Sequence, residues 1–318
     1  MGEFYQDGPV LENCFTADAL LQGYLRFRLP AAMRERILPE LVQFGADVAG
    51  KLFHWNMLAE RHPPQHIPFD PWGRRIDDVR MHEVWHSFHE VAALEGLVAI
   101  GYERADGEFS RLHQFTKLYL FHPSSGFYSC PLAMTDGAAR MLEVLGTEQQ
   151  QQYYRHLISR DPQDFWTSGQ WMTERTGGSD VSETGTVARR DGEQYRLYGT
   201  KWFSSATTAD MAMALARVEG DPAGNGGLSV FLLELRDAFG KLCNIRLDRL
   251  KDKLGTRGLP TAELYLDGVP AQMVGRQGGG VAAISEQFNV TRIYNAACAS
   301  GTIRRAVQLA TNYASRRR

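Results

Sequence analysis

The stretch that says most about this fold is Trp171-Met172-Thr173-Glu174-Arg175-Thr176-Gly177-Gly178-Ser179-Asp180. Apolar residues end at Met172, and a loop with two adjacent glycines and flanking hydroxyl groups follows. Glycine allows unusual torsions and lets backbone N–H groups approach a ligand closely. The loop is therefore a candidate for contacts with a polar ring edge or a phosphate, and an ordinary exposed turn is the alternative.

A second informative segment, Lys201-Trp202-Phe203-Ser204-Ser205, follows about 20 residues later and has the composition of a strand. Successive side chains of a strand alternate between its faces, so Trp202 and Ser204 are expected on the same face. An indole can cover a flat aromatic ligand, and a hydroxyl group two residues away can donate to a ring nitrogen. A tryptophan packed in a barrel core is the alternative reading of this segment.

The sequence before these segments indicates a helical domain over residues 1–164. Apolar residues recur there with the helical period, and Thr147 followed by Gln150 predicts a capping box at a helix start. The proline-rich segment His62–Pro71 is expected to be a loop, because its prolines cannot occupy a helix interior.

The sequence around and after the two segments indicates two further domains, so we expect a multidomain α+β fold. Short alternating stretches over residues 165–279 predict a β-barrel or sandwich, with a hairpin turn at Asp191-Gly192. Residues 280–318 predict the start of a C-terminal helical bundle, which this chain does not complete. One apolar helix face there needs a partner and consists of Ile303, Ala306, Val307, Ala310 and Tyr313.

Charge and cysteine content exclude several classes of protein. The 318 residues include 35 Lys plus Arg and 37 Asp plus Glu, and a net charge of −2 argues against a dominant basic face for nucleic acid. The four cysteines, Cys14, Cys130, Cys243 and Cys298, have no paired spacing. We therefore expect neither a disulfide framework nor a metal site.

The apolar residues are too scattered for a membrane protein, because no stretch approaches the ~18 consecutive apolar residues of a membrane helix. Residues 1–20 are acidic and lack an apolar segment, so they resemble neither a secretory signal nor a transit peptide. These features favour the cytoplasm over the mitochondrion as the expected compartment.

The two opening segments together resemble the flavin signature of the acyl-CoA dehydrogenase family, a TE-x-x-x-GSD stretch followed by W-[IF]-[TS]. Three later stretches extend the resemblance across the chain. They are Asp252–Thr261, similar to a K-x-G-x-R-x-S-x-T loop, Asp267–Pro270, similar to F-x-D-V-x-V-P, and Thr291–Arg317, similar to the first helix of the C-terminal bundle.

The N-terminal zone resembles one branch of that family, the AidB-like branch, which is related to the bacterial alkylation-response flavoprotein. The similarity lies in Pro63-Pro64, Gly73–Arg80 and Trp85-His86, which match a PP…GRR-x-DDV-x-x-H-x-x-WH pattern. A catalytic role for His82, His86 or His89 and a structural role in sealing the N-terminal helices both remain open.

The resemblance implies an FAD site. Met172 and Thr173 are expected to border the flavin ring, with Thr173 at its pyrimidine edge. Gly178 and Ser179 are expected beside the flavin pyrophosphate, where Ser179 also lies at the mouth of the acyl-CoA channel.

The strand segment supplies the rest of this chain's expected flavin contacts. Trp202 is expected to pack on the isoalloxazine together with Phe203, and Ser204 to form a hydrogen bond near N5. Arg317 matches an arginine that, in relatives, reaches the flavin pyrophosphate of a neighbouring subunit.

The resemblance also implies a substrate site, formed by Ser179, Asn289, Thr291 and Arg292. Asn289 replaces an aspartate that contacts the CoA moiety in many members. Some members carry the catalytic glutamate at the position of Thr291, and threonine cannot act as a carboxylate base. We therefore expect the base beyond Arg318, in a chain that is a C-terminally truncated form.

The activity implied is α,β-dehydrogenation of an acyl-CoA thioester with FAD as hydride acceptor, in a homodimer or homotetramer that passes electrons to an acceptor such as an electron-transfer flavoprotein. A flavin oxidase on the same scaffold is one alternative. The other is an AidB-like protective or regulatory flavoprotein that binds nucleic acid or acyl-CoA without efficient turnover. The cations of residues 246–257 would favour nucleic acid, but Asp248 and Asp252 interrupt them.

Overall fold

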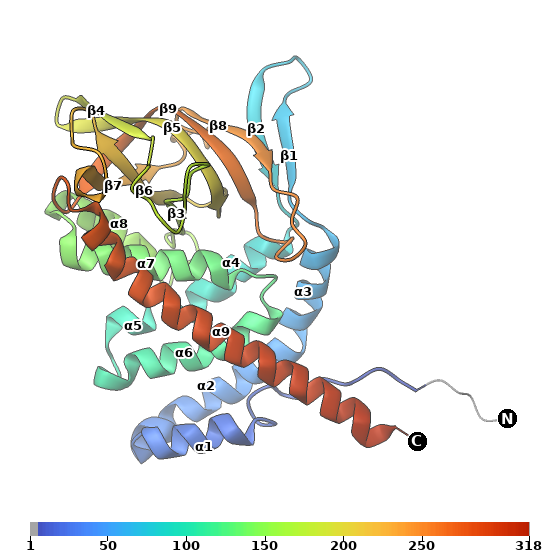
Figure 1. The fold of residues 1–318 in the computed structure, drawn as a ribbon. Helices are drawn as coiled ribbons and strands as arrows, with labels where there is room; N and C mark the ends of the chain where they lie inside the picture. Colours follow the sequence, from blue (N-terminus) through green and yellow to red (C-terminus); the bar gives the residue numbers. More distant parts are fainter. Residues whose placement is uncertain (1–5, 318) are drawn as a thin grey trace.

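The structure is a computed structural model that describes residues 6–317, and it has a helical half and a sheet half joined by one long helix (Figure 1). In Figure 1 the sheet lies above the helices of the N-terminal zone, and helix α9 begins below the sheet and runs diagonally across those helices. Two clusters of buried apolar side chains correspond to this division, one mainly among the helices and one inside the sheet. The expected α+β class is confirmed.

The helical half consists of short and medium helices connected by tight turns. The capping box predicted at Thr147 and Gln150 is confirmed, and it precedes α8. The helices are α1 (Ala19–Arg28), α2 (Ala31–Ala49), α3 (Lys51–Arg61), α4 (Val84–Leu94), α5 (Ile100–Glu103), α6 (Ser110–Phe121), α7 (Ser129–Leu145) and α8 (Gln151–Leu157).

The expectation of a loop over His62–Pro71 is wrong for its central part. Strand β1 (Gln65–Phe69) pairs with β2 (Arg75–Arg80) in an antiparallel hairpin that stands beside the main sheet (Figure 1). The pairing register shifts between Ile67 and Phe69, at Pro68. Proline is tolerated at such an irregularity and at a sheet edge, because no ladder N–H is required there.

The main sheet closes on itself as a small barrel. Strands β6, β4, β5, β9 and β7 pair in that order, and β7 pairs again with β6, while β3 pairs with β6 and β8 with β9. The predicted turn at Asp191-Gly192 joins β4 to β5, and Gly192 has a φ of +65°. The strands are β3 (Ser168–Trp171), β4 (Val187–Asp191), β5 (Gln194–Ser205), β6 (Met211–Val218), β7 (Leu228–Glu234), β8 (Ile245–Leu250) and β9 (Thr261–Val274).

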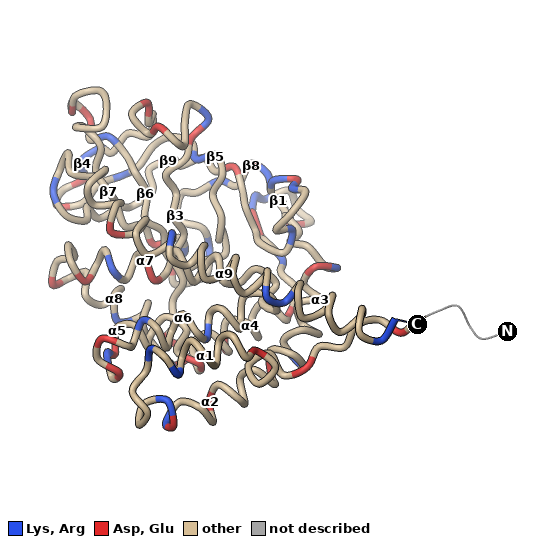
Figure 2. Tube along the Cα trace, turned by 60° about the horizontal axis from the view of Figure 1, so that its bottom comes forward, with Lys and Arg blue, Asp and Glu red and all other residues tan. Residues whose placement is uncertain are grey.

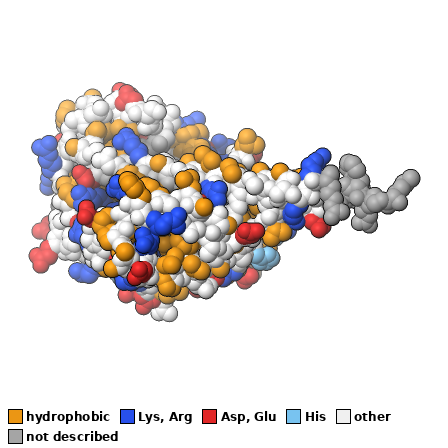
Figure 3. All heavy atoms as spheres, turned by 90° about the horizontal axis from the view of Figure 1, so that it is seen from below, with side chains coloured by type: hydrophobic (Ala, Val, Ile, Leu, Met, Phe, Trp, Pro, Cys, Tyr) orange, Lys and Arg blue, Asp and Glu red, His pale blue; other side chains and the backbone are white. Residues whose placement is uncertain are grey.

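Helix α9 (Gly280–Arg316) packs on α6 and α7 and leaves an apolar face uncovered. Ile303 is 66% exposed and Val307 48% exposed, as expected for a face without a partner. An apolar groove of about 720 Å³ lies between α1, α6 and α9. Seen from below, hydrophobic side chains gather between charged ones on this side (Figure 3). None of the described helices is both long and apolar enough to cross a membrane.

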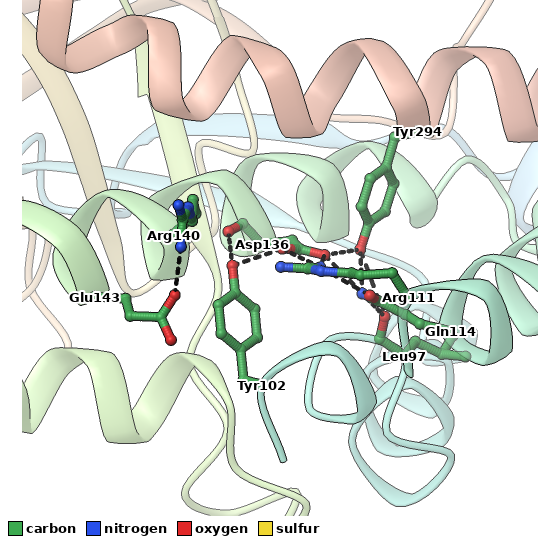
Figure 4. Close-up of polar contacts among 8 residues, drawn as sticks. All are labelled: Leu97, Tyr102, Arg111, Gln114, Asp136, Arg140, Glu143 and Tyr294. Carbon is green, nitrogen blue, oxygen red and sulfur yellow. Dashed lines mark hydrogen bonds and ion pairs between the residues drawn. The ribbon is translucent and has the colours of Figure 1, made fainter. Parts of the chain in front are cut away.

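A buried carboxylate connects four helices to one another (Figure 4). Asp136 of α7 is fully buried and accepts hydrogen bonds from Tyr102 of α5 at 2.7 Å and Tyr294 of α9 at 3.0 Å. From α6, Arg111 donates to it at 2.7 Å and Gln114 at 2.6 Å. The charge is thus both paired and hydrogen-bonded, which a buried carboxylate requires.

We expect the two ends of this network to contribute unequally to stability. Asp136→Ala should lower the free energy of unfolding by about 3 kcal/mol, because it leaves the buried donors of Tyr102, Gln114 and Tyr294 without their acceptor as well as removing the partner of half-buried Arg111. Tyr294→Phe should cost only about 1 kcal/mol, because Asp136 keeps its other donors. Urea unfolding of the two variants measures the difference, and equal losses would contradict the assignment of Asp136 as the centre.

Candidate functional site

The two segments singled out in the sequence meet in the structure. The backbone N–H of Trp202 donates to the carbonyl oxygen of Thr173 at 3.0 Å, which joins the end of β5 to the residues that follow β3. Met172 and Ser204 are buried, and Thr173 and Trp202 are half-buried. The predicted ring-contacting residues therefore come from two neighbouring stretches of backbone.

A buried ion pair between Lys201 and Glu174 connects these two stretches. Lys201 Nζ lies 2.7 Å from Glu174 Oε1 and 2.7 Å from the carbonyl oxygen of Leu215, and neither charged side chain reaches solvent appreciably. Glu174 also accepts hydrogen bonds from Thr186 Oγ1 and from the Gly185 N–H. Burial alone would raise the pKa of Glu174, but Lys201 and these hydrogen bonds hold it below its usual value.

The hydroxyl group of Ser204 is the clearest sign of a ligand in this region. Ser204 is 1% exposed, and its Oγ has no hydrogen-bond partner among the described residues. Buried hydroxyl groups almost always have a partner, so an exception calls for an explanation. A polar ring edge placed against Ser204 would supply one, and the donor therefore fits the flavin that the sequence implies.

The strand is irregular at this point, which strict alternation did not anticipate. The β5–β9 register shifts between Lys201 and Ser204, so Trp202 and Phe203 lie in a bulge. Bulges redirect side chains and are common beside functional sites. Phe203 is 51% exposed here, whereas Lys201 and Ser204 are both buried.

Two cations lie over the Trp202 indole. Lys251 Nζ is 3.2 Å from the ring centroid, and Arg175 Cζ is 4.9 Å from it. Lys251 is also paired with Glu263 at 2.8 Å. These contacts keep the indole at the surface of the barrel instead of in its core, so the core-packing alternative for Trp202 is wrong.

The glycine-rich loop closes tightly on the first segment. A Cβ added to Gly178 would come within 2.9 Å of Thr173 Cγ2, so a larger residue here would require the Thr173 side chain to move. Gly178 and Ser179 are exposed, and Asp180 accepts a hydrogen bond from the Ser182 N–H at 2.9 Å. The loop therefore presents backbone and hydroxyl groups to solvent beside Thr173.

The α9 residues implied by the family form a separate group on one turn of the helix. Asn289 and Arg292 are exposed, and half-buried Thr291 donates to the carbonyl oxygen of Phe288 at 3.2 Å. Arg317 is exposed at the far end of α9, away from the sheet (Figure 1). The structure thus does not bring Arg317 to the flavin segments of its own chain.

Sequence reasoning missed a polar chain that runs from the third motif to the strand. Lys253 Nζ donates to the carbonyl oxygen of Leu259 at 2.7 Å and to Thr261 Oγ1 at 2.9 Å. Thr261 Oγ1 lies 3.0 Å from Ser205 Oγ, next to Ser204. Lys253 and Thr261 both belong to the matched K-x-G-x-R-x-S-x-T stretch. The motif therefore singles out both residues, but it does not predict that they contact each other.

The cations of residues 246–257 are largely neutralised within the sheet. Arg246 pairs with Asp248 at 2.8 Å, and both Arg249 and Lys251 pair with Glu263. Figure 2 shows Lys and Arg interspersed with Asp and Glu over the whole trace. This pattern is typical of a solvated mixed-charge strand and does not favour a nucleic-acid surface.

The Glu174–Lys201 pair generates a pH prediction. Glu174→Gln should lower the free energy of unfolding by about 3 kcal/mol near neutral pH, because it removes the partner of a buried ammonium group. The lowered pKa of Glu174 means that its contribution is present above the ordinary glutamate pKa of about 4.3 and lost as the pH falls further. The difference in the free energy of unfolding between Glu174→Gln and the native protein should therefore become smaller at acidic pH.

Guanidinium unfolding at pH 7 and at about pH 3.5 measures this difference. The matched control is Glu193→Gln on the exposed β4–β5 turn, where we expect little effect at either pH. A loss for Glu174→Gln that stays constant across the pH range would contradict the role of the carboxylate charge.

Two protein-family profiles match the chain. One is described as the acyl-CoA dehydrogenase middle domain and matches residues 169–269. The other is described as the N-terminal domain of the adaptive response protein AidB and matches residues 9–162. The boundary between them falls just before β3.

Curated relatives match along most of this chain. Acyl-CoA dehydrogenase family member 11 of Caenorhabditis elegans is 45% identical, over 99% of this chain and 53% of its own length. The putative acyl-CoA dehydrogenase AidB of Escherichia coli is 31% identical, over 82% of this chain and 49% of its own length. The chain thus spans about half the length of these relatives.

Solved structures agree closely with the fold. The apo form of Bd2924 has a TM-score of 0.97 at 52% identity and covers 99% of this chain, which covers 64% of it. The Caenorhabditis elegans protein ACDH-11, solved in complex with C11-CoA, has a TM-score of 0.96 at 44% identity and covers 100% of this chain, which covers 56% of it. The chain belongs to the acyl-CoA dehydrogenase family, in its AidB-like branch.

Proposed function

We propose that this protein is an FAD-dependent acyl-CoA dehydrogenase that oxidises the Cα–Cβ bond of an acyl-CoA thioester. The observation that carries the proposal is the unpartnered Ser204 hydroxyl group, buried beside the junction of Thr173 and Trp202. These are the residues at which the family signature implies the flavin ring. ACDH-11, whose fold is similar, was solved in complex with C11-CoA, and this ligand supports an acyl-CoA as the substrate class.

The flavin ring would be held by Met172, Thr173, Trp202, Phe203 and Ser204. Ser204 would donate to the ring near N5, and the Trp202 indole would pack against it. The buried Lys201–Glu174 pair sets the spacing of these groups without touching the ring. When bound, FAD supplies the hydride-accepting chemistry that no side chain of the protein can provide.

The pyrophosphate would lie beside Gly178 and Ser179, where exposed backbone and hydroxyl groups can approach a phosphate closely. Arg317 would serve the equivalent site of a neighbouring subunit, in a homodimer or homotetramer. Reoxidation would require an electron acceptor such as an electron-transfer flavoprotein.

The thioester would bind between Ser179 and the α9 residues Asn289, Thr291 and Arg292. Hydrogen bonds to the thioester carbonyl increase the acidity of the α-proton, so that a carboxylate base can remove it. Thr291 lacks a carboxyl group, so the base is a carboxylate outside this set. Asn289 would face the CoA moiety without the charge of the aspartate found in many members.

Flavin binding is the first test. We expect Ser204→Ala to weaken FAD binding by about fivefold to tenfold, because it removes one hydrogen bond of about 1 kcal/mol. Trp202→Ala should weaken it further through lost ring contact. Titration of the apoprotein with FAD, followed by flavin fluorescence, measures both effects. Ser300→Ala, an exposed serine on α9, is the control and should leave the affinity unchanged.

Substrate-dependent reduction is the second test. Anaerobic addition of a medium- or long-chain acyl-CoA to the FAD-loaded protein should perturb the visible flavin spectrum on binding, and bleaching should follow only in protein that contains the carboxylate base. Arg292→Ala should weaken acyl-CoA binding by about tenfold while FAD binding remains unchanged, because this guanidinium group acts on the thioester ligand alone. Absence of both CoA binding and bleaching, in protein that binds FAD, would contradict the proposed substrate.

A further inference from the structure

A polar cavity of about 470 Å³ lies where the helical half meets the barrel, and the proposed function does not use it. It is built from β2, the Trp85-His86 motif on α4, the start of α7 and the turn between β5 and β6. Ligand sites often form at such junctions between domains, and the volume falls within the usual range of about 300–1,000 Å³.

The carboxylate of Asp210 lies in this cavity without a cationic partner. Its Oδ2 accepts hydrogen bonds from the Thr167 N–H at 2.7 Å and from Thr167 Oγ1 at 3.2 Å. No described Lys, Arg or His nitrogen comes within ion-pair distance of it. Burial raises the pKa of Asp210, and the Thr167 hydrogen bonds and nearby His89 offset this effect only in part.

The cavity also contains an unpaired cation. Arg236 lines the same space, and its Nη1 donates to the carbonyl oxygen of Gly240 at 3.0 Å. No described carboxylate pairs with it, and it does not reach Asp210. A carboxylate and a guanidinium group therefore line one cavity without forming an ion pair with each other.

Aromatic side chains also line this cavity, and the polar groups of Tyr128 and His89 already have hydrogen-bond partners. The rings of Trp85 and Tyr128 meet edge to face at 4.8 Å, and both residues are almost fully buried. His89 Nε2 lies 3.1 Å from the Pro162 carbonyl oxygen, and His89 Nδ1 lies 2.8 Å from the Tyr128 hydroxyl group, so both ring nitrogens already have hydrogen-bond partners. Asp210 and Arg236 thus line the cavity as charged groups that have no oppositely charged partner among the described residues.

We propose that this cavity binds a small zwitterion whose ammonium group contacts Asp210 and whose carboxylate contacts Arg236. Trp85 and Tyr128 line the cavity, and aromatic rings there suit an alkylammonium group because they attract cations. Exposed His86 lines the cavity and adds a hydrogen-bond donor for the carboxylate end. Asp78 at the rim is already paired with Arg80 at 3.2 Å.

The test uses three probes of equal chain length: 4-aminobutyrate, n-butylamine and butyrate. Isothermal titration calorimetry on the full 318-residue chain should give 4-aminobutyrate a Kd at least about tenfold below those of the other two, because only it satisfies both charges. Asp210→Asn should reduce its affinity to that of butyrate. Arg236→Gln should reduce it to that of n-butylamine.

Asp191→Asn is the matched control, because Asp191 is an exposed carboxylate on the β4–β5 turn, outside the cavity. It should leave all three affinities unchanged. Arg236 is half-buried, so Arg236→Gln should fold even if Asp210→Asn is destabilised, and thermal unfolding checks both. Absence of 4-aminobutyrate binding at millimolar concentration, or equal binding of the three probes, would overturn the proposal.

Discussion

The buried carboxylate of Asp136 determines how the long C-terminal helix sits on the rest of the molecule. Tyr294 of α9 donates to it, and Tyr294 lies one helical turn after Thr291. The carboxylate is held in turn by donors from α5 and α6, so three helices specify the position of one turn of α9. The proposed thioester residues therefore depend on a contact that none of them makes.

A second buried charge performs the corresponding task for the proposed flavin residues. The Lys201–Glu174 pair lies between the glycine-rich loop and β5, so its geometry sets the distance between Thr173 and Trp202. Both networks are polar, centred on a buried carboxylate and well satisfied, and such networks specify one arrangement at the cost of strong sensitivity to losing a partner. The proposed flavin residues and the proposed thioester residues are thus each positioned by a buried polar network whose members are not among the proposed FAD or acyl-CoA contacts.

Several elements of the fold can be predicted from short stretches of sequence. The capping box at Thr147, the turn at Asp191-Gly192 and the exposed face of α9 all follow from short-range rules, and each is present. The β1–β2 hairpin does not follow from local pattern, because prolines indicate a loop there and the strand exists only through its pairing with β2. The bulge at Trp202 was missed for a similar reason, since it arises from pairing with β9.

The sequence by itself determined the class of fold, the family and the two segments proposed to contact the flavin, because those properties reside in contiguous motifs whose chemistry is local. Only the tertiary structure decided which residues hold those segments in place and which charges share a cavity. Asp136 and Tyr294, which form a hydrogen bond, are far apart in the chain, and so are Trp85 and Asp210, which line one cavity; the spacing of neither pair signals that they lie near each other. Such contacts depend on how packed elements bring distant residues together, and burial then determines whether a charge must find its partner within the protein or from a ligand.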